Sequence, residues 1–95
     1  MNIEITSRNF KSSNNLLLLI KNKIKKIEKF GAKLINCHII LNKINNDENI
    51  EIIVKAKNHE FISSSTSNNF EISLKEAIGK IITQIKKQHS KDIGR

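Results

Sequence analysis

The chain opens with alternating polar and apolar residues and then changes to a helical spacing. Within the first six residues Ile3 and Ile5 fall on one face, which is the two-residue period of a half-buried strand. Further along, Ser13 or Asn14 can cap a helix, which is predicted to end at Gly31 in the left-handed conformation that helix ends prefer. The apolar stripe of this helix is Leu16, Leu17, Ile20, Ile24, Ile27 and Phe30.

Three more strands are predicted in the middle of the chain. The first spans 34–41, and the Asn and Asp residues of 43–49 suit a polar loop after it. The next strand spans 50–57, where apolar and charged residues alternate, and a tight connection at 58–59 leads into the last strand. Small serines on one face of this last strand leave room for a helix to pack closely. Its inward residues are Phe61, Ser63 and Ser65.

A second amphipathic helix follows the break at Asn68 and Asn69, which can cap its start. Its stripe is Leu74, Ala77, Ile78, Ile81, Ile82 and Ile85. The pattern fades after His89, and residues 90–95 are expected to be a frayed tail. The order strand, helix, three strands, helix predicts one α+β domain over 1–95. Antiparallel strands would form a four-stranded sheet with both helices on its one apolar face.

Composition narrows the class of protein. The 95 residues are 38% hydrophobic, enough for one modest core. The longest apolar run, 16–20, is too short to cross a bilayer, and the N-terminus does not have the pattern of a signal peptide. Cys37 is the only cysteine, and no Cys, His or carboxylate spacing suits a zinc site. We therefore expect a cytoplasmic protein with no membrane segment, metal or cofactor.

Positive charge is concentrated on the two predicted helices. The net charge of +8 attracts polyanions at long range, although the Lys, Asn and Ile bias of an AT-rich genome would also raise it. Glu28 is the only acid in the first helix, so its lysines repel one another, a cost that a phosphate backbone removes on binding. The first helix carries Lys21, Lys23, Lys25, Lys26 and Lys29. The second carries Lys80, Gln84, Lys87 and Lys91 as one stripe, with Lys75 and Lys86 on its other flank.

The arrangement of these lysines favours folded or double-stranded RNA as the partner. Two helices side by side on one sheet face would bring both sets to the same side of the molecule. All four Phe residues are predicted to sit in the core, so none is expected to stack on bases, and recognition would rest on shape and phosphate. These residues are Phe10, Phe30, Phe61 and Phe70.

Catalytic chemistry finds no support in the residues. Cys37 and His38 are adjacent in a predicted strand, so they point to opposite faces and cannot form a thiol–imidazole pair. The serines at 63–65 lie in no Gly-x-Ser-x-Gly setting, and the three glycines form no phosphate loop. The sequence therefore predicts a protein that is not an enzyme and has no small-molecule substrate.

Four strings, in this order and separation, resemble the ribosome hibernation promoting factor family, which includes the ribosome-associated inhibitor called protein Y. They are Asn-Ile-Glu-Ile-Thr at 2–6, Lys-Ile-Glu-Lys-Phe at 26–30, Leu-Ile-Asn-Cys-His-Ile-Ile-Leu at 34–41 and Lys-Ile-Ile-Thr-Gln-Ile-Lys-Lys at 80–87. The resemblance implies a β-α-β-β-β-α fold similar to double-stranded-RNA-binding domains. It also implies a seat in the small ribosomal subunit between head and body, where such proteins overlap the messenger RNA path and tRNA sites and silence idle ribosomes during starvation or stationary phase.

The resemblance also assigns roles to single residues. It implies that Gln84 is a polar contact or a helix-packing residue. The residues implied to contact ribosomal RNA are Lys23, Lys26, Lys80, Lys87 and Lys91. The chain departs from the family at the start of the second helix, where Asn69 and Glu71 replace an Asp-x-Tyr turn and Lys75 replaces an Asp. The sequence ends at Arg95 without the dimerising domain of the long form, so we expect a monomer off the ribosome that does not pair ribosomes alone.

Three hypotheses follow. The first is a ribosome-bound translation inhibitor that acts by occlusion on the small subunit and its rRNA. The second is a small protein-interaction module whose lysines only keep it soluble. The third is a general duplex-RNA binder, which would have equal affinity for free duplex and for ribosomes. Binding that weakens steeply with salt distinguishes phosphate contacts from the second hypothesis.

Overall fold

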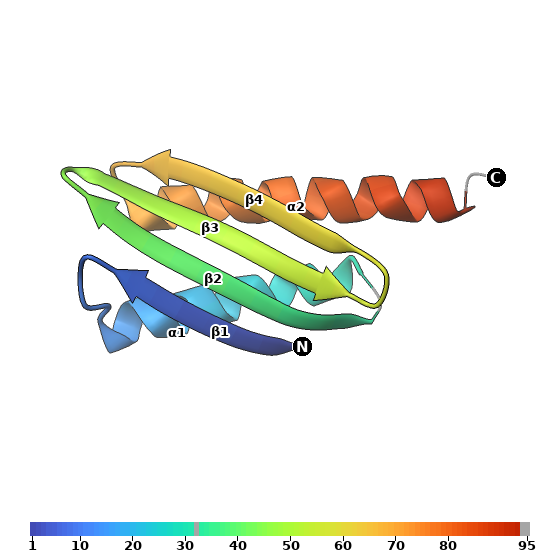
Figure 1. Cartoon of the computed structure of the whole chain (residues 1–95), viewed down its shortest axis with the longest axis horizontal. Helices are drawn as coiled ribbons and strands as arrows, with labels where there is room; N and C mark the ends of the chain where they lie inside the picture. The colour runs from blue at the N-terminus through green and yellow to red at the C-terminus, as the bar shows by residue number, and fades with distance from the viewer. Residues whose placement is uncertain (32, 94–95) are drawn as a thin grey trace.

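The computed structural model describes residues 1–31 and 33–93, with side chains described as far as His89 (Figure 1). The order of the helices and strands confirms the predicted β-α-β-β-β-α arrangement, with one short 3₁₀ helix added. The elements are β1 (Asn2–Arg8), α1 (Asn14–Ile24), η1 (Lys25–Lys29), β2 (Leu34–Ile44), β3 (Asp47–Ala56), β4 (Glu60–Ser67) and α2 (Phe70–Ile93). In this part of the chain neither helix combines the length and apolarity that a membrane crossing requires.

The four strands form one sheet in the order β1-β2-β3-β4. β3 is antiparallel to both of its neighbours, but β1 and β2 run parallel, so the prediction of an antiparallel sheet is wrong at this pair. The reason is the intervening helix, which returns the chain to the end of the sheet where β1 began. Ile5, Ile39, Ile52 and Ser63 lie side by side in one row across all four strands.

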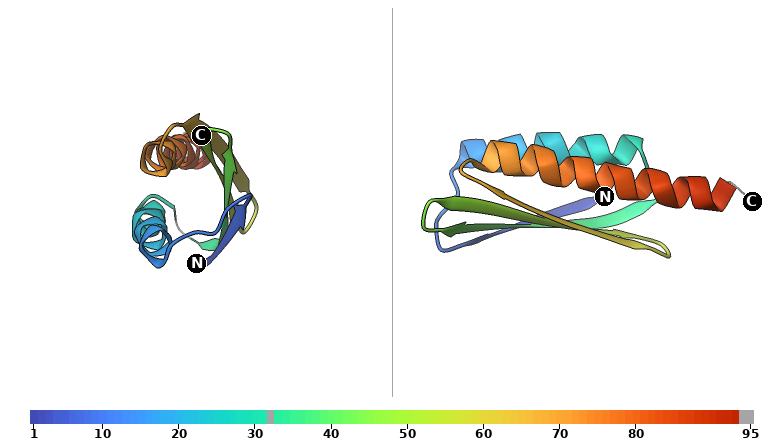
Figure 2. Two further views of the ribbon diagram at one scale, coloured as in Figure 1. Left: turned by 90° about the vertical axis from the view of Figure 1, so that its left-hand side faces the viewer. Right: turned by 90° about the horizontal axis from the view of Figure 1, so that it is seen from above.

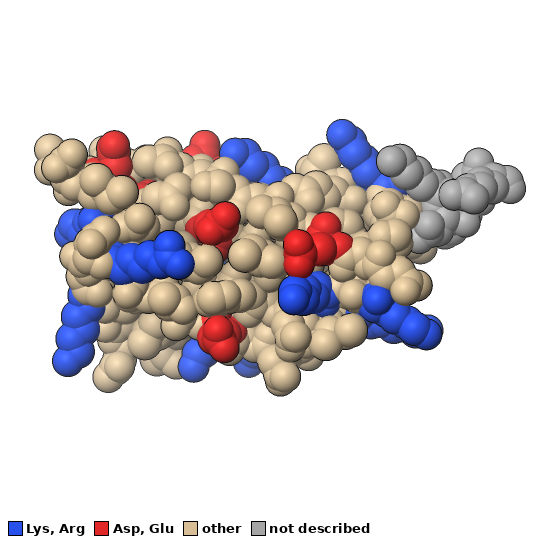
Figure 3. All heavy atoms as spheres, viewed as in Figure 1, with Lys and Arg blue, Asp and Glu red and all other residues tan. Residues whose placement is uncertain are grey.

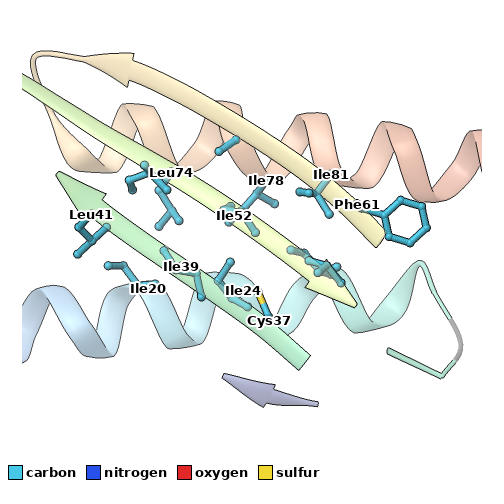
Figure 4. Packing of buried hydrophobic residues seen from close by; sticks show 14 of the residues in the cluster. Ile20, Ile24, Cys37, Ile39, Leu41, Ile52, Phe61, Leu74, Ile78 and Ile81 are labelled. Carbon is cyan, nitrogen blue, oxygen red and sulfur yellow. The ribbon is translucent and has the colours of Figure 1, made fainter. Parts of the chain in front are cut away.

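Both helices cover the same face of the sheet (Figure 2), as predicted. The core between the layers is aliphatic (Figure 4) and follows the predicted stripes. Burying each large aliphatic side chain contributes about 1.5–3 kcal/mol to stability. The side chains that are at most 1% exposed include Ile20, Ile24, Ile27, Cys37, Ile39, Leu41, Ile50, Ile52, Val54, Leu74, Ala77 and Ile81.

The connection between β2 and β3 is much tighter than predicted. Instead of a polar loop over 43–49, the strands continue to Ile44 and resume at Asp47, with only Asn45 and Asn46 between them. Asn45 has φ 55°, a left-handed conformation that asparagine tolerates better than most residues. The asparagines that suggested a loop therefore make a two-residue hairpin turn.

The first helix begins as predicted and ends differently. The Ser13 Oγ accepts a hydrogen bond of 3.1 Å from the Leu16 backbone N–H. Gly31 does not have the predicted positive φ; the positive φ in this connection belongs to Lys33, at 63°. A Cβ on Gly31 would lie 3.2 Å from Cγ2 of Ile85, a tight contact that would require the Ile85 side chain to shift by a few tenths of an ångström.

Helix α2 is anchored at its start and longer than predicted. Asn69 Oδ1 accepts from the Glu71 N–H at 2.7 Å, which confirms the predicted cap. An unpredicted partner, Glu48 of β3, accepts from the Phe70 N–H at 2.7 Å. The helix runs past its expected end near His89 to Ile93, because no glycine or proline occurs between those two residues. Residues 94–95 of the expected tail lie outside the described residues.

Candidate nucleic-acid interface

Charge is distributed unequally between the two sides of the molecule. The segment α1–η1 carries five lysines and one glutamate, and these lysines are all exposed. The outer face of the sheet instead shows acidic and basic side chains interspersed among uncharged ones (Figure 3). Three of these acids, Glu4, Glu51 and Glu60, belong to β1, β3 and β4. A polyanion is therefore attracted to the helix side.

A groove between the two helices is lined by three of the predicted lysines. Lys23 and Lys26 enter it from α1 and η1, and Lys75 enters it from α2. Its volume is about 400 Å³, and Leu74 and Ile78 supply its apolar lining. Glu71 is the one acid among the residues that line it. Three lysines in a groove with apolar lining suit the phosphates and sugars of a nucleic-acid strand.

The predicted second stripe lies on the other flank of α2, away from this groove. Lys80 Nζ donates to the Ser64 carbonyl oxygen at 2.7 Å. The Gln84 side chain makes two hydrogen bonds with Ile62: its Nε2 donates to the carbonyl oxygen at 2.7 Å, and its Oε1 accepts from the backbone N–H at 3.2 Å. Lys80 and Gln84 thus cover the outer backbone of β4, which is an edge strand.

Serines on the inner face of β4 form hydrogen bonds with the side of α2 that packs on the sheet. Ser63 Oγ donates to the Ala77 carbonyl oxygen at 2.8 Å, and Ser65 Oγ donates to Glu76 Oε1 at 2.8 Å. The predicted close packing of a helix against these small residues is confirmed. Because α2 is fixed to β4 on two sides, the position of Lys75 on its far flank is set by the sheet.

The remaining predicted lysines occupy separate places. Lys87 borders a shallow hollow beside the start of β4, and Lys86 Nζ lies 5.0 Å from the ring centroid of Phe30. Lys91 belongs to α2, but its side chain lies outside the described residues. The other exposed lysines of the first helical segment are Lys21, Lys25 and Lys29. The structure therefore places the predicted residues on several surfaces of the helix layer.

Ion pairs leave the helix lysines available to a partner. Those found among the described residues join the Met1 amino group to Glu28 and Lys43 to Glu48. The His38 ring lies 3.4 Å from Glu4 Oε1. No helix lysine with a described side chain takes part in these ion pairs. Their charge is therefore not neutralised within the molecule, which is the condition under which phosphate binding releases counterions.

Phe30 is not in the core, contrary to prediction. It follows η1 and is 39% exposed, whereas Phe61 and Phe70 are buried, and Phe10 stacks on Phe70 with ring centroids 5.0 Å apart. A 3₁₀ helix rises about 2.0 Å per residue instead of 1.5 Å, so the chain reaches the end of the core sooner than an α-helical wheel assumes. One aromatic ring is consequently accessible at the basic end of the first helical segment.

Cys37 and His38 point to opposite faces of β2, as predicted. Cys37 is 1% exposed, and burial raises the pKa of its thiol to about 12, so it stays protonated at neutral pH. His38 Nε2 lies 2.8 Å from Thr6 Oγ1 on the outer face. No group of three metal-ligating side chains occurs among the described residues. The electrostatic feature that distinguishes the molecule is its lysine surface.

Comparison with known proteins agrees with the fold and with the predicted resemblance. No curated protein sequence matches the chain significantly. The structure is similar to a ribosomal subunit interface protein from Coxiella burnetii (TM-score 0.87, 21% identity, 95% of this chain and 99% of that one). It is also similar to the N-terminal domain of Thermus thermophilus Protein Y (TM-score 0.84, 17% identity, 92% and 98%).

At these identities the two structures establish the fold alone. The sequence itself matches, over residues 3–92, the family model described as sigma 54 modulation protein / S30EA ribosomal protein. That match covers nearly all of the chain and includes the four strings on which the resemblance was based, apart from Asn2 of the first string. The chain therefore belongs to the sigma 54 modulation protein / S30EA ribosomal protein family.

Proposed function

We propose that this protein binds the small ribosomal subunit with its helix side against ribosomal RNA, and that it inhibits translation by occupying the messenger RNA path and tRNA sites. The observation that carries the proposal is the groove in which Lys23, Lys26 and Lys75 meet without an intramolecular ion pair among the described residues. Membership of the sigma 54 modulation protein / S30EA ribosomal protein family supports a ribosomal partner. The inhibition works by occlusion, and we propose that it takes place in the cytoplasm of cells that are starved or in stationary phase.

The groove, and not the whole lysine surface, is the centre of the proposed interface. Two rigid elements hold its lysines, because α1–η1 and α2 both pack on the same sheet core. Lys21, Lys25 and Lys29 extend the positive surface along the first helix. The flank with Lys80 and Gln84 is secondary in this proposal, because both side chains already bond to β4. Each phosphate that the lysines neutralise adds a salt-dependent contribution to binding.

The test measures co-sedimentation with purified bacterial small ribosomal subunits at increasing salt. For duplex-like RNA the slope of log K against log salt is about −0.9 per neutralised phosphate. Replacing Lys23, Lys26 and Lys75 together by Gln is expected to reduce the steepness of this slope by about 2–3 and to abolish inhibition in a cell-free translation assay.

A matched control replaces Lys11, Lys55 and Lys57 by Gln. It removes the same net charge from exposed positions outside the helices. We expect its salt slope to stay close to that of the parent protein. Equal slopes for the two triple variants would reject the groove as the contact surface. Binding whose affinity does not change with salt supports the protein-interaction hypothesis instead. Equal affinity for a free RNA duplex and for small subunits supports the general duplex-RNA binder.

A further inference from the structure

A small hollow beside Phe30 combines the features of a site for a flat aromatic ligand. Its volume is about 180 Å³. Leu34, Phe61 and Ile85 contribute apolar side chains to its lining, and Phe30, His59 and His89 contribute aromatic rings. We call it the Phe30 hollow. Its apolar lining suits a ring face, and the imidazole nitrogens can donate to or accept from a polar ring edge.

The hollow lies next to the proposed RNA surface. Lys26, which lines the groove between the helices, belongs to η1, and Phe30 directly follows that helix. Lys29 and Lys33 flank Phe30 in the sequence and are exposed. A strand whose phosphates contact these lysines would therefore pass beside the hollow.

We propose that the Phe30 hollow binds one unpaired nucleobase of the RNA, stacked on the Phe30 ring. This inference rests on the function proposed above. A nucleobase fits because it has an apolar face for the ring and a hydrogen-bonding edge for His59 or His89. The lysines beside it supply counter-charges for the phosphates of the same nucleotide. Protein–RNA recognition commonly uses such stacking for bases that are splayed out of a helix.

In the free protein the Phe30 ring already has a cationic neighbour, Lys86, whose Nζ lies 5.0 Å from the ring centroid. Lys86 is not among the residues that line the hollow, so a base can enter the hollow while the ammonium group stays beside the ring.

Two substitutions at Phe30 test the proposal. Phe30→Leu keeps an apolar side chain and removes the ring, so its binding to small ribosomal subunits is expected to weaken on the order of tenfold. Its salt slope should stay unchanged, because no phosphate contact is lost. Phe30→Trp keeps a stacking ring and introduces the only tryptophan of the chain. Its fluorescence should be quenched on binding. Ile44→Ala, which shortens an exposed apolar side chain on the sheet hairpin, is the control.

A defined RNA separates failure of this proposal from failure of the proposed function. The probes are two duplexes that differ by one bulged adenosine. Preference for the bulged duplex, lost in Phe30→Leu and kept in Phe30→Trp, supports the hollow even if small subunits are not bound. Equal affinity for both duplexes, or binding to neither, overturns it. Salt-dependent binding of small subunits that Phe30→Leu leaves unchanged overturns the hollow and leaves the proposed function intact.

Discussion

Gln84 offers a sharp test of how the edge of the sheet is held, because its amide makes two hydrogen bonds with the backbone of Ile62. We consider Gln84→Met, which keeps nearly the same length and helix propensity but can neither donate to the Ile62 carbonyl nor accept well from its N–H. A change in stability can then be assigned to these two bonds.

The magnitude follows from where the bonds lie. A net hydrogen bond contributes about 0.5–1.5 kcal/mol, and water can partly replace these two because they are exposed. We therefore expect the free energy of unfolding to fall by about 1–2 kcal/mol. For a domain of this size, 1 kcal/mol corresponds to a change in melting temperature of about 4–8 °C.

The assay is urea unfolding followed by far-ultraviolet circular dichroism, with Thr83→Met as the control. Thr83 is exposed, and among the described residues its hydroxyl donates within α2, to the Gly79 carbonyl. We expect this control to change stability by no more than about 0.5 kcal/mol. An unchanged urea midpoint in Gln84→Met would refute the role of Gln84 at the β4 edge. Weaker ribosome binding by the fully folded variant would show that the amide also contacts RNA.

Two further predictions concern stability. Gly79 lies on the exposed side of α2, and a Cβ there would meet no atom within 4 Å; Gly79→Ala should therefore raise the free energy of unfolding by about 1 kcal/mol, measured by the same urea assay. The pKa of the Cys37 thiol is raised from 9.0 to about 12 by burial, so its contribution to stability is complete below pH 9. It is lost as pH rises toward 12, because only the unfolded chain releases the proton. Unfolding measured against pH should show this fall in the parent protein and a smaller one in Cys37→Ala.

The sequence predicts the layers of this fold well because periodicity reports burial directly. Ile20, Ile24 and Ile27 recur on one helical face, and Ile50 and Ile52 recur on one strand face; all are fully buried. Turn and chain-end details depend instead on contacts between distant segments. Glu48 caps the start of α2 from β3, and no local pattern at either position indicates that pairing.

The candidate site was predictable in composition but only partly in position. A helical wheel places Lys26 opposite the buried stripe of the first helix and Lys23 and Lys75 on the flanks of their helices, and the sheet brings the three together in one groove. The helical wheel does not show that Lys80 and Gln84 face the open edge of β4, because their position depends on where α2 lies across the sheet. The 3₁₀ helix η1, in place of the last α-helical turn, likewise leaves the ring of Phe30 exposed, where the helical wheel predicts that it is buried.

The excess of lysines on the helix layer, set against the mixed charges of the opposite sheet face, gives the molecule an electric dipole moment. In the field of a large polyanion such a molecule turns helix-first before any atoms touch, which raises the share of collisions that can dock. The torque fades once mobile ions shorten the reach of the field to about 8 Å at 0.15 M. Association should therefore slow with added salt even where the final contacts are unchanged.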